Sequence, residues 1–233
     1  MITAETLAFL TNIRDHNTKE WMEANRKEYL EMKANVEDFA SDLVNEISKF
    51  DNLIASRPPH PTKCVTRLTR DMRFPTTKGP YKWDYYVVVG YQGIQGLAAS
   101  YAVHIEPGNC FAGGGTPNPK GIDLLNYRKK VSYNFDEFKK IIENPTFVKL
   151  FPNGITSQSG VVKKRIPAAF QKNDPAAEYL KKEGFITREK LADEDLQTSE
   201  GFAKIIQLLK GSHPLVAFLN EELKLKELPN LFS

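Results

Sequence analysis

A long run of apolar residues at helical spacing, closed by a proline-rich segment, sets the strongest limit on this fold. From Trp21 to Phe50 the apolar residues follow steps of three, four and seven, which predicts one buried stripe along a single long helix. The segment from Arg57 to Pro61 holds three prolines and cannot continue a helix, so we expect an extended loop there. A shorter helix is expected before the long one, over Ala4 to Ile13.

The middle of the chain changes to the two-residue alternation of β-strands. This alternation is clearest from Leu97 to Glu106, and we expect further strands at 64–69, 85–91 and 110–114. Pro107-Gly108-Asn109 predicts a tight turn between two of them. Because the connections are short and carry no helical pattern, the sheet is expected to be antiparallel.

Helical patterns return in the second half. We expect short helices at 121–131, 135–143 and 175–182, the last with Asp174 as its N-cap. An apolar C-terminal pair is expected at 202–209 and 214–225, broken at Gly211-Ser212. The sequence therefore predicts an α+β fold with a central, mainly antiparallel β-sheet flanked by N-terminal and C-terminal helices. With no repeat or convincing linker, residues 1–233 are expected to form a single domain.

Composition narrows the class of protein. Of the 233 residues, 41% are hydrophobic and 26% charged, which is enough apolar material for a core and argues against global disorder. No apolar run approaches the roughly 20 residues that span a bilayer, and the N-terminus does not resemble a signal peptide. Only two cysteines occur, Cys64 and Cys110, without a Cys-x-x-Cys pair. We therefore expect a reduced, cytoplasmic protein with no membrane partner.

Positive charge is concentrated in residues 63–82, which we call the basic segment. The segment contains six basic residues and one acidic residue, so its net charge is +5, whereas the net charge of the whole chain is only +3. The seven residues are Lys63, Arg67, Arg70, Arg73, Lys78, Lys82 and the acid Asp71. A local excess of this size indicates a site for an anionic partner.

The residue types of the basic segment suit phosphate or carboxylate, because arginine offers planar paired donors and keeps its charge. Strand geometry would point Arg67, Asp71 and Arg73 to one face and Arg70 to the other. The turn at Gly79-Pro80 would fold the following residues over the same surface. The predicted ligand-binding residues are Arg67, Arg70, Asp71, Arg73, Lys78, Tyr81 and Lys82. An internal network of ion pairs between sheet and helices fits these residues equally well.

Two residues are candidates for catalysis, Asp71 and His104. Asp71 would be held ionised among the arginines, where it could orient a neighbour or act as a weak base. His104 lies on the strand face opposite the apolar row and could act as an acid or base, although a hydrogen-bonded structural role is the favoured alternative. No histidine pair has ligand spacing, so neither a metal nor another cofactor is expected. The run Gly113–Gly115 is interpreted as a turn or bulge in preference to a phosphate-binding loop.

The basic segment also carries a family resemblance. Arg67-x-x-Arg70-Asp71-x-Arg73-Phe74, followed by Lys78-x-Pro80-Tyr81-Lys82, resembles the hallmark of the DUF2461 family, a domain of unknown function. Further similarities run through most of the chain, at Phe9-Leu10, Asn17–Trp21, Pro107-Gly108, Gly113–Gly115, Arg128, Gly160, Lys163 and Asp174-Pro175. The chain departs from the family pattern at Thr77, Gly79 and Thr116. The resemblance implies kinship and no particular reaction.

Two classes of function stay open. The first is a small-molecule binding protein or enzyme with a basic Arg/Lys pocket for a phosphorylated or carboxylated ligand. The second is a non-catalytic module that binds nucleic acid or another protein. A pI near 8.7 is lower than the value expected of a dedicated nucleic-acid binder, which favours the first class. Catalysis and oligomeric state are not determined by the sequence.

Overall fold

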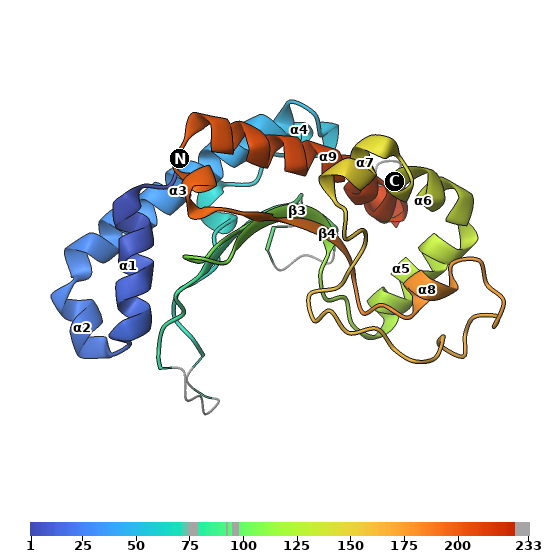
Figure 1. The fold of residues 1–233 in the computed structure, drawn as a ribbon, viewed down its shortest axis with the longest axis horizontal. Helices are drawn as coiled ribbons and strands as arrows, with labels where there is room; N and C mark the ends of the chain where they lie inside the picture. Colours follow the sequence, from blue (N-terminus) through green and yellow to red (C-terminus); the bar gives the residue numbers. More distant parts are fainter. Residues whose placement is uncertain (72, 74–78, 92, 95–97, 227–233) are drawn as a thin grey trace, which may run out of the picture. The chain divides into compact units, whose positions relative to one another are not determined.

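The computed structural model describes residues 1–71, 73, 79–91, 93–94 and 98–226. It confirms the α+β class, with helices at both ends of the chain and a four-stranded antiparallel sheet (Figure 1). The strands are β1 (Tyr85–Val89), β2 (Ser100–Ile105), β3 (Cys110–Thr116) and β4 (Phe185–Leu191). Their order in the sheet follows their order in the sequence, so each strand pairs with the next one along the chain.

The chain divides into two compact units, each assembled from segments that are distant in sequence. Unit 1 comprises Met1–Gln95, Ala102–Ala112 and Lys190–Gln207, and unit 2 comprises Gly96–Tyr101, Gly113–Glu189 and Leu208–Ser233. The expectation of a single domain over residues 1–233 stays a prediction.

Unit 1 begins with the N-terminal helices, which are α1 (Ala4–Asp15), α2 (Lys19–Ala24), α3 (Arg26–Ser48) and α4 (Asn52–Ser56), followed by a 3₁₀ turn, η1 (Pro61–Lys63). Helix α3 buries its apolar stripe, including Phe39 and Ile47, and packs on α1 and β1. The single helix expected over 21–50 is wrong at Asn25, where the helix breaks. The Asn25 side chain donates to the Trp21 carbonyl at 2.8 Å, and this local bond competes with the helical backbone pattern.

Unit 2 contains four shorter helices, which are α5 (Gly121–Tyr133), α6 (Phe135–Ile142), α7 (Pro145–Leu150) and α8 (Ala177–Leu180). Phe138 of α6 is fully buried and contacts the rings of Tyr179 and Phe218 at centroid distances of 5.0 and 5.7 Å. Aromatic pairs at this separation add to the free energy gained from burying apolar surface. These rings hold α6 and α8 against the C-terminal helix.

Helix α9 (Ser199–Lys226) is continuous, so the predicted break at Gly211-Ser212 is wrong. The Ser212 hydroxyl donates to the Leu209 carbonyl at 2.8 Å, which keeps the backbone polar groups of this turn satisfied. At Gly211 the side chain of Leu150 fills the space that a Cβ would occupy. Glycine is therefore needed here for close packing and does not end the helix. Among the described helices, none is both long and apolar enough to cross a membrane.

Strand β4 was not predicted, and it explains the glycine run in β3. Built on Gly113 or Gly115, a Cβ would collide with the β4 carbonyl oxygens of Thr187 or Phe185. Glycine at these two positions lets the two backbones approach closely. The run therefore belongs to a strand, where β4 occupies the space beside two of its glycines.

Candidate functional site

The described residues of 64–88 form two segments that pair in antiparallel fashion and extend from β1, and we call them the arm (Figure 1). The described residues of the basic segment lie on both sides of this pairing. Isolated antiparallel bridges join Val65 to Val87 and Thr69 to Tyr81. Backbone bonds from Arg70 N to Pro80 O and from Lys82 N to Leu68 O, at 2.8 and 2.7 Å, connect the two sides. The arm therefore places residues 68–70 of the basic segment beside residues 80–82.

A bulge separates the two bridges of the arm. Between them, residues 66–68 on one side face residues 82–86 on the other, so three residues oppose five. Extra residues on one strand bend it and redirect its side chains, and such bulges are common beside functional sites. This bulge contains Trp83 and Asp84.

The arm is fixed to the turn between α1 and α2 by one side chain, that of Asn17. Its Oδ1 accepts from Tyr81 N and its Nδ2 donates to Tyr81 O, each at 3.0 Å. Gly79 has a φ of +73°, and a Cβ there would lie 2.6 Å from Asn17 Oδ1. Asn17 and Gly79 together define the position of the arm at Tyr81.

Arg70 is held in one orientation by two contacts. Its Nε donates to Tyr81 O at 2.9 Å, and its guanidinium carbon lies 5.1 Å from the centre of the Trp83 ring. The side chain is half-buried. Within the described part of the chain, its terminal Nη groups have no hydrogen-bond acceptor and no carboxylate within 4.0 Å. Arg70 thus presents a fixed pair of donors.

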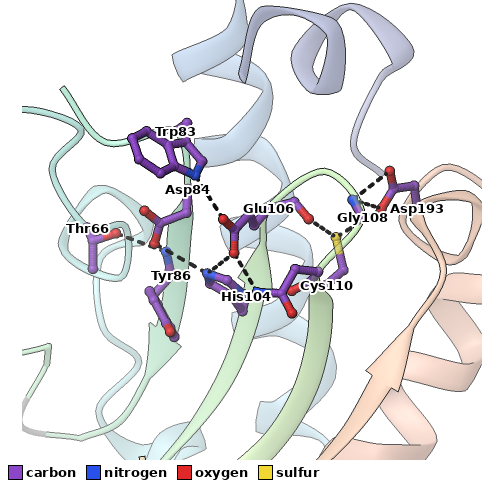
Figure 2. A network of polar contacts seen from close by, with 10 residues as sticks. Thr66, Trp83, Asp84, Tyr86, His104, Glu106, Gly108, Cys110 and Asp193 are labelled. Carbon is purple, nitrogen blue, oxygen red and sulfur yellow. Dashed lines mark hydrogen bonds and ion pairs between the residues drawn. The ribbon is translucent and has the colours of Figure 1, made fainter. Parts of the chain in front are cut away.

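Beside Arg70, a polar cluster surrounds His104 of β2 (Figure 2). The ring is only 3% exposed. Its Nε2 lies 3.3 Å from Asp84 Oδ2 and 3.9 Å from Glu106 Oε2, and its Nδ1 lies 3.0 Å from Asn109 O. Both ring nitrogens thus lie within hydrogen-bond distance of protein oxygen atoms.

Two half-buried aromatic rings pack against His104. The centres of the Tyr86 and Phe111 rings lie 4.3 and 4.6 Å from that of the imidazole. Because both ring nitrogens have partners within the protein, neither is left to contact a ligand in this geometry. It acts here as a positioning residue for the carboxylates around it.

The two carboxylates of the cluster differ in their remaining capacity. Glu106 uses both oxygens, accepting from Trp83 Nε1 at 2.9 Å and from Asn109 Nδ2 at 2.6 Å. Asp84 uses Oδ2 toward His104, while its other oxygen has no donor among the described residues. The Asp84 side chain is 22% exposed. One carboxylate oxygen is therefore available to a ligand.

The charges around Asp84 keep it ionised. Burial alone would raise its pKa, but the hydrogen bond to His104 and the charges of His104, Lys82 and Arg70 lower the pKa below its usual value overall. Lys82 makes no ion pair within 4.0 Å to any described carboxylate. Asp84 therefore lies near two cations, Arg70 and Lys82, and makes no direct ion pair with either.

A family model described as a conserved hypothetical protein (DUF2461) matches residues 5–218, which is nearly the whole chain. The chain belongs to the DUF2461 family. No curated protein and no solved structure matches it. The match confirms the resemblance carried by the Arg67–Lys82 pattern, and in this DUF2461 chain the described residues of the pattern lie in the arm.

The DUF2461 arm brings some predicted site residues together and separates others. Arg70, Tyr81 and Lys82 lie around the bulge. Arg67 is exposed while Leu68 is buried, so alternation places Arg67 on the face opposite to Arg70. Lys78 lies outside the described residues.

Asp71 and Arg73 pair with each other in this DUF2461 chain. Arg73 Nη2 lies 2.6 Å from Asp71 Oδ2, and Asp71 Oδ1 also accepts from Arg73 N at 3.1 Å. The hydrogen bonds from Arg73 hold the pKa of Asp71 below its usual value. Both side chains are largely exposed, at 46% and 84%. Asp71 therefore orients Arg73, and among the described residues no hydrogen bond or ion pair joins it to Arg67 or Arg70.

Sequence reasoning missed Asn17, Trp83, Asp84 and Glu106 as members of the DUF2461 site. One signal was available, because Glu106 follows His104 by two residues and alternation puts both on one face of a strand. Asp84 gave no comparable signal, since the bulge that redirects it depends on pairing with residues 66–68. Within the described ranges, no group of three His, Cys, Asp or Glu side chains could hold a metal ion.

Proposed function

We propose that this DUF2461 protein binds a small phosphorylated or carboxylated ligand at the bulge of the arm, with Arg70 and Lys82 as the anion-binding residues. The observation that carries the proposal is the state of Arg70. Its Nε donates to Tyr81 O and its guanidinium lies over the Trp83 ring, while its terminal N–H groups have no acceptor among the described residues. Two parallel N–H donors match the oxygens of a phosphate or carboxylate, and a guanidinium already held in place loses little entropy on binding.

The structure gives more support to ligand binding than to catalysis by Asp71 or His104, the two catalytic candidates from the sequence. Asp71 is engaged with Arg73, and both nitrogens of His104 have partners. The internal ion-pair network, the alternative interpretation of the basic segment, describes Asp71 and Arg73 but not Arg70 or Lys82. We therefore infer a binding site and propose no reaction.

The test compares Arg70→Ala with Arg73→Ala in a thermal-shift titration with inorganic phosphate at constant ionic strength. Wild type and Arg73→Ala are expected to gain the same rise in Tm. Arg70→Ala should bind phosphate about ten- to a hundredfold more weakly, the equivalent of about 1.5–3 kcal/mol for charge-assisted bonds. Equal shifts in all three proteins would overturn the proposal. Arg70→Lys keeps the charge without the paired donors, and it replaces Arg70→Ala if that variant unfolds.

The salt dependence of binding distinguishes the nucleic-acid alternative from the small-ligand site. Binding to a single-stranded oligonucleotide through several phosphates weakens steeply with salt, by nearly one power of salt concentration per phosphate neutralised. A single anion site at the arm predicts little or no oligonucleotide binding. Tight, strongly salt-dependent binding that survives Arg70→Ala would favour the alternative.

We also propose a cytoplasmic location. Cys64 and Cys110 are both unpaired and buried, as expected of a protein kept in a reducing compartment. Fractionation of cells that produce the tagged chain tests this, and recovery from a secreted or membrane fraction would contradict it.

A further inference from the structure

The unused oxygen of Asp84 bears on what else the ligand must carry. The two carboxylates of the cluster are equally exposed, at 22% and 24%, yet only Glu106 has both oxygens occupied. An anion on Arg70 and Lys82 would lie close to the ionised Asp84. Like charges at short range repel in a partly buried site, so a bare anion meets a penalty there.

A hydrogen-bond donor on the ligand removes that penalty. A hydroxyl group donates to a carboxylate in a charge-assisted bond, which is stronger than a bond between neutral groups. The site then discriminates in favour of a molecule with an anionic group and a hydroxyl a short distance apart. A ligand without the hydroxyl would leave the charge of Asp84 uncompensated.

Trp83, the residue before Asp84, adds an aromatic ring to the bulge, with the Arg70 guanidinium against one of its faces. Its indole is half-buried, is fixed by the bond from Nε1 to Glu106 and precedes Asp84 in the bulge. Figure 2 shows Trp83 and Asp84 on neighbouring positions above the His104 ring. An aromatic ring with polar groups at its edge suits a ligand that is apolar on one side and hydroxylated on its rim, as a sugar ring is.

We propose that the ligand is a sugar phosphate, with its phosphate on Arg70 and Lys82 and a sugar hydroxyl donating to the free oxygen of Asp84. This inference rests on the proposed function and adds the class of ligand to it. Asp84 is a specificity residue in this arrangement, since it favours hydroxylated anions over bare ones.

Isothermal titration at pH 8 with methyl phosphate, ribose 5-phosphate and phosphoethanolamine tests the inference on wild type, Asp84→Asn and Asp71→Asn. Methyl phosphate carries the anionic group at this pH without a hydroxyl, so wild type should bind ribose 5-phosphate about tenfold or more tightly, since one charge-assisted bond contributes about 1.5–3 kcal/mol. In Asp84→Asn this preference should decrease, because ribose 5-phosphate binds more weakly and methyl phosphate binds more tightly. Asp71→Asn, which removes an exposed carboxylate paired elsewhere, should keep the wild-type preference.

The ratio of the two affinities is the decisive readout, because a loss of folding stability would lower both. A ratio that is unchanged in Asp84→Asn overturns the role of Asp84. Binding of methyl phosphate that depends on Arg70, without tighter binding of ribose 5-phosphate, overturns the inference and leaves the proposed function standing. Absence of binding by either overturns both. Tighter binding of phosphoethanolamine than of ribose 5-phosphate overturns the sugar and points to an ammonium donor.

Discussion

Arg70 and Arg73 lie on the same side of the arm, close together in sequence, yet their charges are used differently. Arg73 is largely exposed and is neutralised by Asp71, two residues before it. Arg70 is half-buried, stacks on Trp83 and bonds to Tyr81 O, with its terminal donors left over. Identical side chains thus form a local ion pair in one case and, in the other, a fixed guanidinium that we propose as the anion-binding group.

The difference shows that a charged side chain is neutralised or left available for a ligand according to whether its partners are local in sequence or distant. Asp71 and Arg73 meet through a local turn, which needs no tertiary structure. Arg70 is placed by Tyr81, and Tyr81 is fixed by Asn17 from the other end of unit 1. Exposed ion pairs contribute little to stability, whereas a preorganised, half-buried donor contributes to recognition.

The largest effect is expected where the arm meets Asn17. Gly79→Ala forces a side chain into a left-handed backbone and into contact with Asn17, and should lower the free energy of unfolding by about 2 kcal/mol. Gly93→Ala is the matched control, since its φ is +71° and nothing lies within 4 Å of the added Cβ. That variant should lose only about 1 kcal/mol. Urea denaturation of both proteins measures the difference, and equal losses would mean that Asn17 does not fix the arm.

A smaller effect is expected in the pH dependence of stability. The pKa of Asp84 is lowered in the folded protein, so its contribution is present above the unfolded value of about 4 and is lost as the pH falls through the folded pKa. Asp84→Asn should therefore be less stable than wild type at pH 7, and the two should converge toward pH 3.

Asp71→Asn provides the comparison at the exposed ion pair. The pKa of Asp71 is also lowered, but solvent screens the fully exposed pair, so its pH-dependent stability difference should be smaller than that of Asp84→Asn. Urea midpoints measured from pH 7 to pH 3 give both curves. A larger effect at Asp71 would reverse the ranking of the two sites.

The smallest effect concerns the thiol of Cys64, where the arm begins. Burial raises the pKa of Cys64 to about 11 and is the main reason that the pKa of Cys110 rises to about 12. At pH 8 about a thousandth of Cys64 is thiolate, so alkylation by iodoacetamide should be far slower in the folded protein than in urea. Rapid labelling of Cys64 in the native protein would show that the start of the arm opens.

The sequence predicted those features of the fold that depend on local periodicity. The change from helical spacing to alternation located most strands, and α1, α5 and α6 lie where they were expected. Errors arose where packing overrides a local signal, as at Gly211, whose lack of a side chain makes room for Leu150. Strand β4 escaped notice because its charged residues Arg188 and Lys190 dilute the apolar alternation.

The candidate site divides in the same way. Charge density pointed to the basic segment, and the family match confirms the pattern that it carries. The sequence could not tell which arginine keeps free donors, because that depends on contacts between residues 17 and 81 and on a bulge in the pairing. Local composition located the segment, and tertiary contacts select Arg70 within it.

Anomalous diffraction from crystals soaked in tungstate, a heavy analogue of phosphate, tests the central claim most directly. The account predicts a tungsten peak within hydrogen-bond distance of the Arg70 guanidinium, with Lys82 beside it, and no peak in Arg70→Ala crystals. A peak at Arg73, or an Arg70 whose terminal nitrogens are occupied by a carboxylate of the protein itself, would contradict it.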